Sequence, residues 1–179
     1  SGHYCFRIRD YRQALELYET AANLGSVPED VQMRYASCLV RSENRRSEGE
    51  KEYQRLIEKY RNNKGIKQSY VAALLGAGDV DQAKTKYDLY IEGDPDPRWR
   101  SMLGRIQFGL HQYPEAEKIF RGLIGAEKIP EPWLYAQLAR SLLYQGAVAD
   151  ALAEVSRALA LHPTHPELLG LKGAVHERL

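Results

Sequence analysis

The sequence predicts an all-α fold in which antiparallel helix pairs stack side by side as a solenoid. Three observations lead to this prediction. A turn-then-helix phrase recurs at a nearly constant period, each copy carries a small residue followed four positions later by a larger apolar one, and Pro- and Gly-containing breakers separate the copies. With 44% hydrophobic and 27% charged residues, the 179-residue chain can form a folded core of this kind.

The recurring phrase predicts the second helix of each pair. Clear copies span 9–21, 78–90, 111–123 and 146–158, and a weaker copy spans 47–56. Alignment on the small residue gives separations of 35, 34, 33 and 35 residues. Small residues let two helices approach closely, and the larger residues fill the remaining space. The small residues are Ala14, Gly49, Ala83, Ala116 and Ala151. The larger ones are Tyr18, Tyr53, Tyr87, Phe120 and Val155.

An apolar stripe upstream of the phrase predicts the first helix of each pair, over 31–40, 69–78, 100–110 and 131–146. Breakers at 25–30, 93–97, 128–132 and 162–166 separate the pairs. The expected units of this single domain are 1–29, 30–63, 64–96, 97–131 and 132–165, with a final helix over 166–179. Because both ends fall inside a unit, we expect a fragment of a longer array. Alternatively, the last helix is a solvating cap.

In period and residue pattern the sequence resembles the tetratricopeptide repeat family over nearly its whole length. The unit 132–165 fits best, and its matching residues are Tyr135, Leu138, Ala139, Leu142, Gly146, Ala151, Val155, Ala158 and Pro163. The unit 30–63 departs most, because Gly49 stands where alanine is usual and the proline is missing, which predicts a looser or misaligned pair. The resemblance implies a right-handed superhelical solenoid whose first helices line a concave groove, and a binding role without catalysis.

The repeat phase predicts which residues face that groove. The candidate partner-binding residues are Arg7, Arg34, Arg41, Gln68, Arg98, Arg105, Phe108, Trp133, Arg140 and Tyr144, and His3, Phe6, Cys38 and Leu75 are expected on the same side. Arginine binds carboxylates bidentately and stacks on rings, so this set, with almost no acid in it, predicts a groove for an acidic peptide or protein segment, or for an anionic polysaccharide. Alternatively, the arginines are only the solvent-exposed edge of amphipathic helices and bind no partner. The family's terminal-carboxylate clamp is not expected, because its asparagines are absent.

No catalytic group, cofactor or metal site is expected. The segment 162–167 holds His162, His165 and Glu167, but its prolines favour an inter-repeat turn. The glycines of 74–79 lack the strand and the lysine–threonine pair of a phosphate loop and instead predict a hairpin turn. Cys5 and Cys38 either pair across neighbouring helices or remain ordinary thiols, which is the favoured alternative. The charged segment 41–52 predicts a turn with a solvated helix start rather than a docking loop.

A protein–protein interaction scaffold is the leading functional hypothesis. The net charge of +1 argues against a protein whose whole surface binds nucleic acid. No apolar run is long enough for membrane insertion by this segment. No targeting segment is visible, so the compartment stays open between periplasm and cytoplasm. Three alternatives remain: a periplasmic repeat region of a bacterial exopolysaccharide export or secretion protein, on a loose resemblance over 74–95, a chaperone of a secreted protein, and a regulatory domain of an enzyme.

Overall fold

The computed structural model describes residue 16, residues 18–20 and residues 27–177. Within these residues the secondary structure is helical and contains no strand, so the all-α prediction is confirmed. The chain divides into two compact units, the first ending at Lys86 and the second beginning at Tyr87. The helices are α2 (Glu29–Arg41), α3 (Arg46–Lys59), α4 (Lys64–Gly76), α5 (Val80–Tyr90), α6 (Pro97–Gly109), α7 (Tyr113–Ala126), α8 (Pro132–Tyr144), α9 (Val148–Leu161) and α10 (Pro166–His176).

Local sequence explains where several helices begin and end. The Asn63 side chain accepts a hydrogen bond from the Gly65 N–H at 2.9 Å at the start of α4, and Asp96 caps α6 in the same way. Proline occupies the first turn of α6, α7, α8 and α10, where its missing N–H costs nothing. Gly78 and Gly146 end α4 and α8 in the left-handed conformation, each with a φ of 79°.

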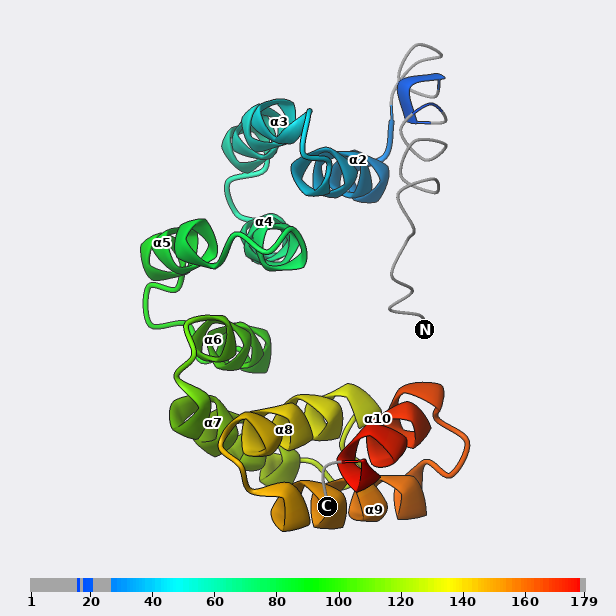
Figure 1. Cartoon of the computed structure of the whole chain (residues 1–179). Helices are drawn as coiled ribbons and strands as arrows, with labels where there is room; N and C mark the ends of the chain where they lie inside the picture. Colours follow the sequence, from blue (N-terminus) through cyan, green and yellow to red (C-terminus); the bar gives the residue numbers. More distant parts are fainter. Residues whose placement is uncertain (1–15, 17, 21–26, 178–179) are drawn as a thin grey trace. The chain divides into compact units, whose positions relative to one another are not determined.

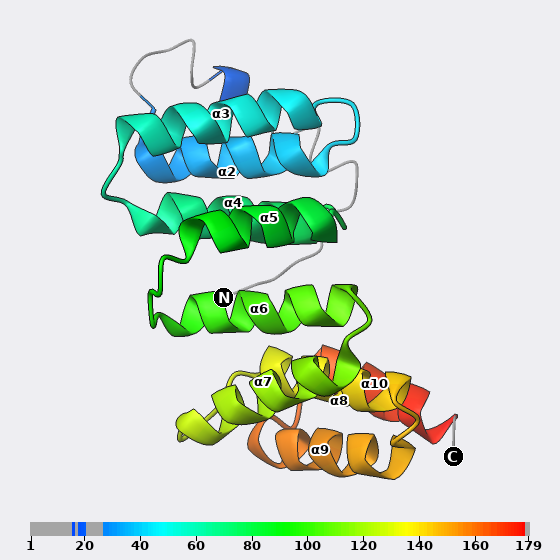
Figure 2. The same ribbon diagram turned by 90° about the vertical axis from the view of Figure 1, so that its left-hand side faces the viewer.

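In the first unit, α2 packs against both α3 and α4, and α3 also packs against α4. Both views show α2 and α3 lying side by side (Figures 1 and 2). Tyr53 of α3 is fully buried, and its ring stacks on that of Tyr70 with centroids 4.7 Å apart. Lys86 of α5 lies 5.7 Å from the centroid of the same Tyr70 ring.

Gly49 has a packing role that the sequence did not reveal. A Cβ at this position would lie 2.5 Å from the Val40 backbone nitrogen and 2.8 Å from Leu39 Cβ. The glycine therefore allows α3 to approach α2 more closely than alanine would. The expected looser or misaligned pair is wrong for this contact, because the missing methyl group is what makes the close approach feasible.

In the second unit, α6 packs on α7, α7 on α8 and α8 on α9, and α10 contacts both α8 and α9. The residues expected between paired helices lie in its core, with Ala116, Phe120, Ala151 and Val155 all fully buried. Gly104 of α6 faces Phe120, since a Cβ there would lie 2.9 Å from the Phe120 ring. The small and large residues predicted to pack between paired helices thus lie in the core of this unit.

A helix that crosses a membrane must be both long and apolar. Among the described residues, none of the helices combines the two properties to the degree that a crossing requires.

Candidate functional site

The ten residues expected in the groove fall into three groups. Arg7 lies outside the described residues, as do His3 and Phe6. Arg34, Arg41 and Gln68 belong to α2 and α4 of the first unit, and the remaining residues belong to α6 and α8 of the second. Each unit therefore holds its own part of the set.

In the first unit, Arg34 and Arg41 lie seven residues apart on α2 and therefore on one side of that helix. Arg34 is exposed and lies 3.7 Å from Asp30. Arg41 is half-buried, with its guanidinium so close to Gly76 that a Cβ there would lie 2.8 Å from its Cζ. Gln68 is only 3% exposed, and its Nε2 has no hydrogen-bond partner among the described residues. Because α2 and α3 both pack on α4, Gln68 is not presented at the surface.

In the second unit, the predicted residues form two matching stripes. Arg98, Arg105 and Phe108 follow one another on α6 at steps of seven and three residues, which places them on one side of the helix. On α8, Trp133, Arg140 and Tyr144 follow one another at steps of seven and four residues, which again places them on one side of the helix. We call this set the α6–α8 face, and its members are Arg98, Arg105, Phe108, Trp133, Arg140 and Tyr144.

An aromatic cluster joins the two stripes. The rings of Phe108 and Tyr144 meet edge to face with centroids 5.5 Å apart, which links α6 to α8. Tyr113, from the first turn of α7, stacks on Tyr144 at 4.9 Å and meets Phe108 edge-on at 5.4 Å. His111 is 2.7 Å from the Tyr113 hydroxyl through its Nδ1. Tyr113 and His111 were not among the predicted groove residues, because they lie in the turn and at the start of a second helix rather than on a first helix.

Acidic residues lie nearer to the arginines than the sequence indicated. Arg140 forms a 2.8 Å ion pair with Glu167 of α10, and the two side chains stay 39% and 40% exposed. Arg34 has Asp30 one turn away on its own helix. The set itself was expected to hold almost no acid, and the two carboxylates lie outside it, one on the same helix as Arg34 and the other on α10, which packs on α8.

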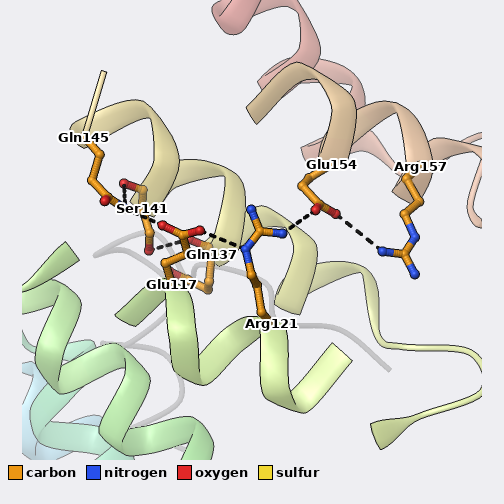
Figure 3. Close-up of polar contacts among 7 residues, drawn as sticks. All are labelled: Glu117, Arg121, Gln137, Ser141, Gln145, Glu154 and Arg157. Carbon is orange, nitrogen blue, oxygen red and sulfur yellow. Dashed lines mark hydrogen bonds and ion pairs between the residues drawn. The ribbon is translucent and has the colours of Figure 1, made fainter. Parts of the chain in front are cut away.

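A second polar network ties three helices of this unit together (Figure 3). Arg121 of α7 bonds Glu117 on its own helix at 2.8 Å and Glu154 of α9 at 2.6 Å. Gln145, next to α8, donates to Glu117 at 2.8 Å. Partial burial would raise the pKa of Glu117, but the hydrogen bonds from Arg121 and Gln145 bring this pKa below its usual value. Arg121 is thus engaged within the fold, which gives this network a structural role.

The turn between α2 and α3 is tied to its surroundings. Arg45 donates to Glu48 at 3.0 Å and to Glu19 at 2.8 Å, and these hydrogen bonds raise the pKa of Arg45. Arg46 forms a 3.1 Å ion pair with Asp79. The charged segment expected over 41–52 is therefore a short, ion-paired turn followed by the start of α3.

The other residues considered for chemistry take ordinary places. His162 Nε2 lies 3.1 Å from the Pro130 carbonyl oxygen, which joins two inter-helix turns. In the part of the chain that the structure describes, no three His, Cys, Asp or Glu side chains are grouped as metal ligands. Burial raises the pKa of the Cys38 thiol, and Arg41 lowers it only in part, so Cys38 is a neutral thiol near pH 7. The alternative in which it pairs with Cys5 concerns a residue outside the described ones.

Comparison with known proteins places this arrangement in a family. Two family models, both described as tetratricopeptide repeat, match residues 71–131 and 132–175. No curated protein matches the sequence. A tetratricopeptide repeat protein from Parabacteroides merdae is similar in structure, with a TM-score of 0.71 and 19% identity over 93% of this chain. A thermophilic protein of the same repeat class in Thermus thermophilus gives the same two values over 95% of this chain and 92% of its own.

The present chain spans 65% of the length of the Parabacteroides protein. At 19% identity these likenesses show the fold alone. The family models go further, because together they cover residues 71–175, which is more than half of the chain. With its helix pairs, small-residue contacts and matching family models, the chain belongs to the tetratricopeptide repeat family.

Proposed function

We propose that the protein is a non-catalytic scaffold that binds an acidic segment of another protein on the α6–α8 face. Tetratricopeptide repeats generally mediate protein–protein interaction, so the class of function follows from the family. The contact between Phe108 and Tyr144 carries the choice of face, because it joins two stripes that each hold an arginine one turn earlier. Arg34 and Arg41 of α2 offer the same chemistry in the first unit.

Physical chemistry favours an acidic segment with apolar anchors. The guanidinium groups of Arg98, Arg105 and Arg140 offer planar forks that match carboxylates, and the neighbouring rings offer apolar contact. Interfaces of this kind gain most of their affinity from a few aromatic and arginine residues. Both types of residue are present on the α6–α8 face.

Glu167 acts as an internal competitor in this proposal. Glu167 forms an ion pair with Arg140 at 2.8 Å, but an exposed ion pair contributes only about 0–1 kcal/mol to stability. A partner carboxylate can therefore replace Glu167 at small cost. The pair keeps the arginine oriented while no partner is bound.

Selection from a random peptide display library on the immobilised protein tests the proposal. The wild type should enrich peptides with clustered Asp and Glu, and the triple variant Arg98→Glu, Arg105→Glu, Arg140→Glu should lose them. The control Lys118→Glu, Lys128→Glu, Arg157→Glu makes the same charge change on exposed residues outside the face and should select like the wild type. Equal helicity and melting of all three proteins is required first. Retention of the acidic peptides by the triple variant would reject the α6–α8 face.

Glu167→Gln supplies the converse measurement. Loss of the internal carboxylate should strengthen binding of a selected acidic peptide by up to about fivefold, whereas Arg140→Gln should weaken it. Fluorescence anisotropy with the labelled peptide measures both changes. Weaker binding by Glu167→Gln would contradict the competitor role.

A further inference from the structure

The aromatic cluster of the second unit differs from the other stacked tyrosine pair of the described chain. Tyr53 and Tyr70 stack in the core with exposed fractions of 0% and 1%, so packing fully explains them. Tyr113 and Tyr144 stack with a similar geometry, at 4.9 Å and 15°, yet Tyr144 remains 60% exposed. Tyr144 therefore keeps more than half of its area at the surface, although Tyr113 stacks on its ring and Phe108 meets it edge to face.

The turn that positions Tyr113 is unusual among the equivalent turns. Five residues before the small residue of the second helix, the chain adopts a positive φ at Gly78, His111 and Gly146. Glycine adopts this conformation freely, whereas histidine at a φ of 61° is strained. His111 compensates through its ring, whose Nδ1 is 2.7 Å from the Tyr113 hydroxyl. A residue that is less favourable for the turn thus holds one ring of the cluster in place, and such strain points to a functional role.

The arginines on the same sides of α6 and α8 restrict the kind of ligand that the cluster can bind. Arg105 precedes Phe108 by three residues, and Arg140 precedes Tyr144 by four, so both guanidinium groups lie on the sides of the helices that carry the rings. Arginine offers only hydrogen-bond donors, and its charge disfavours a cationic ligand. The site therefore suits a segment that carries flat apolar rings, exposes carbonyl acceptors and needs no backbone acceptor in return.

We infer that Phe108, Tyr113 and Tyr144 form a docking site for a proline-rich segment in the polyproline II conformation. Proline rings stack on aromatic side chains, and the solvated carbonyl groups of this helix accept hydrogen bonds while proline has no N–H to satisfy. The segment is preformed, so binding costs little conformational entropy. The inference rests on the proposed function for the use of this face. It adds a proline-rich stretch to the acidic segment of the partner.

Two synthetic peptides of equal charge test the inference. The probe carries two glutamates followed by six prolines, and its control replaces the prolines by alternating glycine and serine. Fluorescence anisotropy should show the proline peptide binding about tenfold more tightly, and Tyr144→Ala should remove that advantage. Tyr144→Phe, which keeps the ring, should retain it. The control Leu161→Ala changes another exposed apolar residue outside the cluster and should bind like the wild type.

His111→Gly separates binding from folding. Glycine relieves the positive φ, so the melting temperature should stay the same or rise, while loss of the bond to Tyr113 should weaken the proline peptide severalfold. Equal binding of both peptides to the wild type, or an unchanged proline advantage in Tyr144→Ala, would overturn the inference. If both peptides bind the triple arginine variant as tightly as the wild type and the proline advantage persists, the aromatic site stands and the acidic-segment proposal fails. If both peptides lose affinity in that variant but bind the wild type equally, the acidic-segment proposal stands and the proline site is rejected.

Discussion

At the scale of single residues, Tyr53 shows how one side chain joins three helices. From α3, its hydroxyl reaches Ser69 of α4 at 2.8 Å and the Met33 carbonyl of α2 at 3.4 Å, while its ring stacks on Tyr70. Burial raises the pKa of Tyr53 to about 12, although hydrogen bonds with Ser69 and Ser37 act in the opposite direction. The fold therefore requires this phenol to stay protonated.

Alkaline pH should weaken the fold through Tyr53. An unfolded tyrosine releases its proton near pH 10, so the folded state, with its pKa of about 12, binds more protons between these values. The contribution of Tyr53 to the free energy of unfolding is fully present below pH 10. It falls by about 3 kcal/mol as the pH rises towards 12. Tyr53→Phe should lose about 1 kcal/mol at pH 7 but show a shallower alkaline decline.

Urea unfolding of both proteins at pH 7, 10 and 11 measures the difference. Tyr35 and Tyr87 also have a raised pKa from burial, and they contribute equally to both proteins. Parallel declines in wild type and Tyr53→Phe would mean that the Tyr53 phenol does not control the alkaline loss.

At the scale of helices, small residues set how closely the members of a pair approach. Gly49 allows the α2–α3 contact and Gly104 allows that of α6 with α7, whereas Gly170 of α10 has no atom within 4 Å of a Cβ built on it. Space at the glycine decides whether an added methyl group separates two helices or only favours the helical backbone.

Gly49→Ala should therefore destabilise the protein by about 1–3 kcal/mol, because α3 must move away from the Val40 backbone. The same substitution at Gly170 should stabilise by about 0.5–1 kcal/mol, since only helix propensity changes. Chemical unfolding followed by circular dichroism compares the two variants with the wild type. A Gly49→Ala protein as stable as the wild type would show that the α2–α3 contact widens without cost.

The sequence could predict these helices because their spacing is local information. The expected segments 31–40, 100–110 and 146–158 match α2, α6 and α9 closely, while the start of α4 was missed because its cap, Asn63, lies in a polar run without apolar period. Contacts between helices of different pairs could not be predicted from this local spacing. The burial of Gln68, the Arg140–Glu167 pair and the aromatic cluster depend on helices from different pairs, so no single repeat contains the information.

At the scale of the whole molecule, each compact unit carries its own buried residues, and helices within a unit differ greatly in how far they are covered. In the second unit α8 contacts α7, α9 and α10 and buries Leu134, Tyr135, Ala136, Leu138, Ala139, Ser141 and Leu142. In α10 the buried residues are Leu168 and Val175. Repeat proteins are stabilised by contacts between neighbouring elements, so these differences should give different local stabilities.

Native-state hydrogen exchange should therefore resolve the two helices. Opening α10 exposes two buried residues, Leu168 and Val175, and the partly buried Leu171, whereas opening α8 exposes seven buried residues of a helix packed against three others. Amides of α10 should therefore exchange more than about tenfold faster than those of α8. Measurement under conditions where closing outpaces exchange gives the opening free energy of each amide, and Ala139 and Gly173 serve as reporters because they lie inside their helices. Leu168→Ala should accelerate exchange in α10 first and leave the α8 amides nearly unchanged. Equal acceleration in both helices would mean that the second unit opens as one cooperative block.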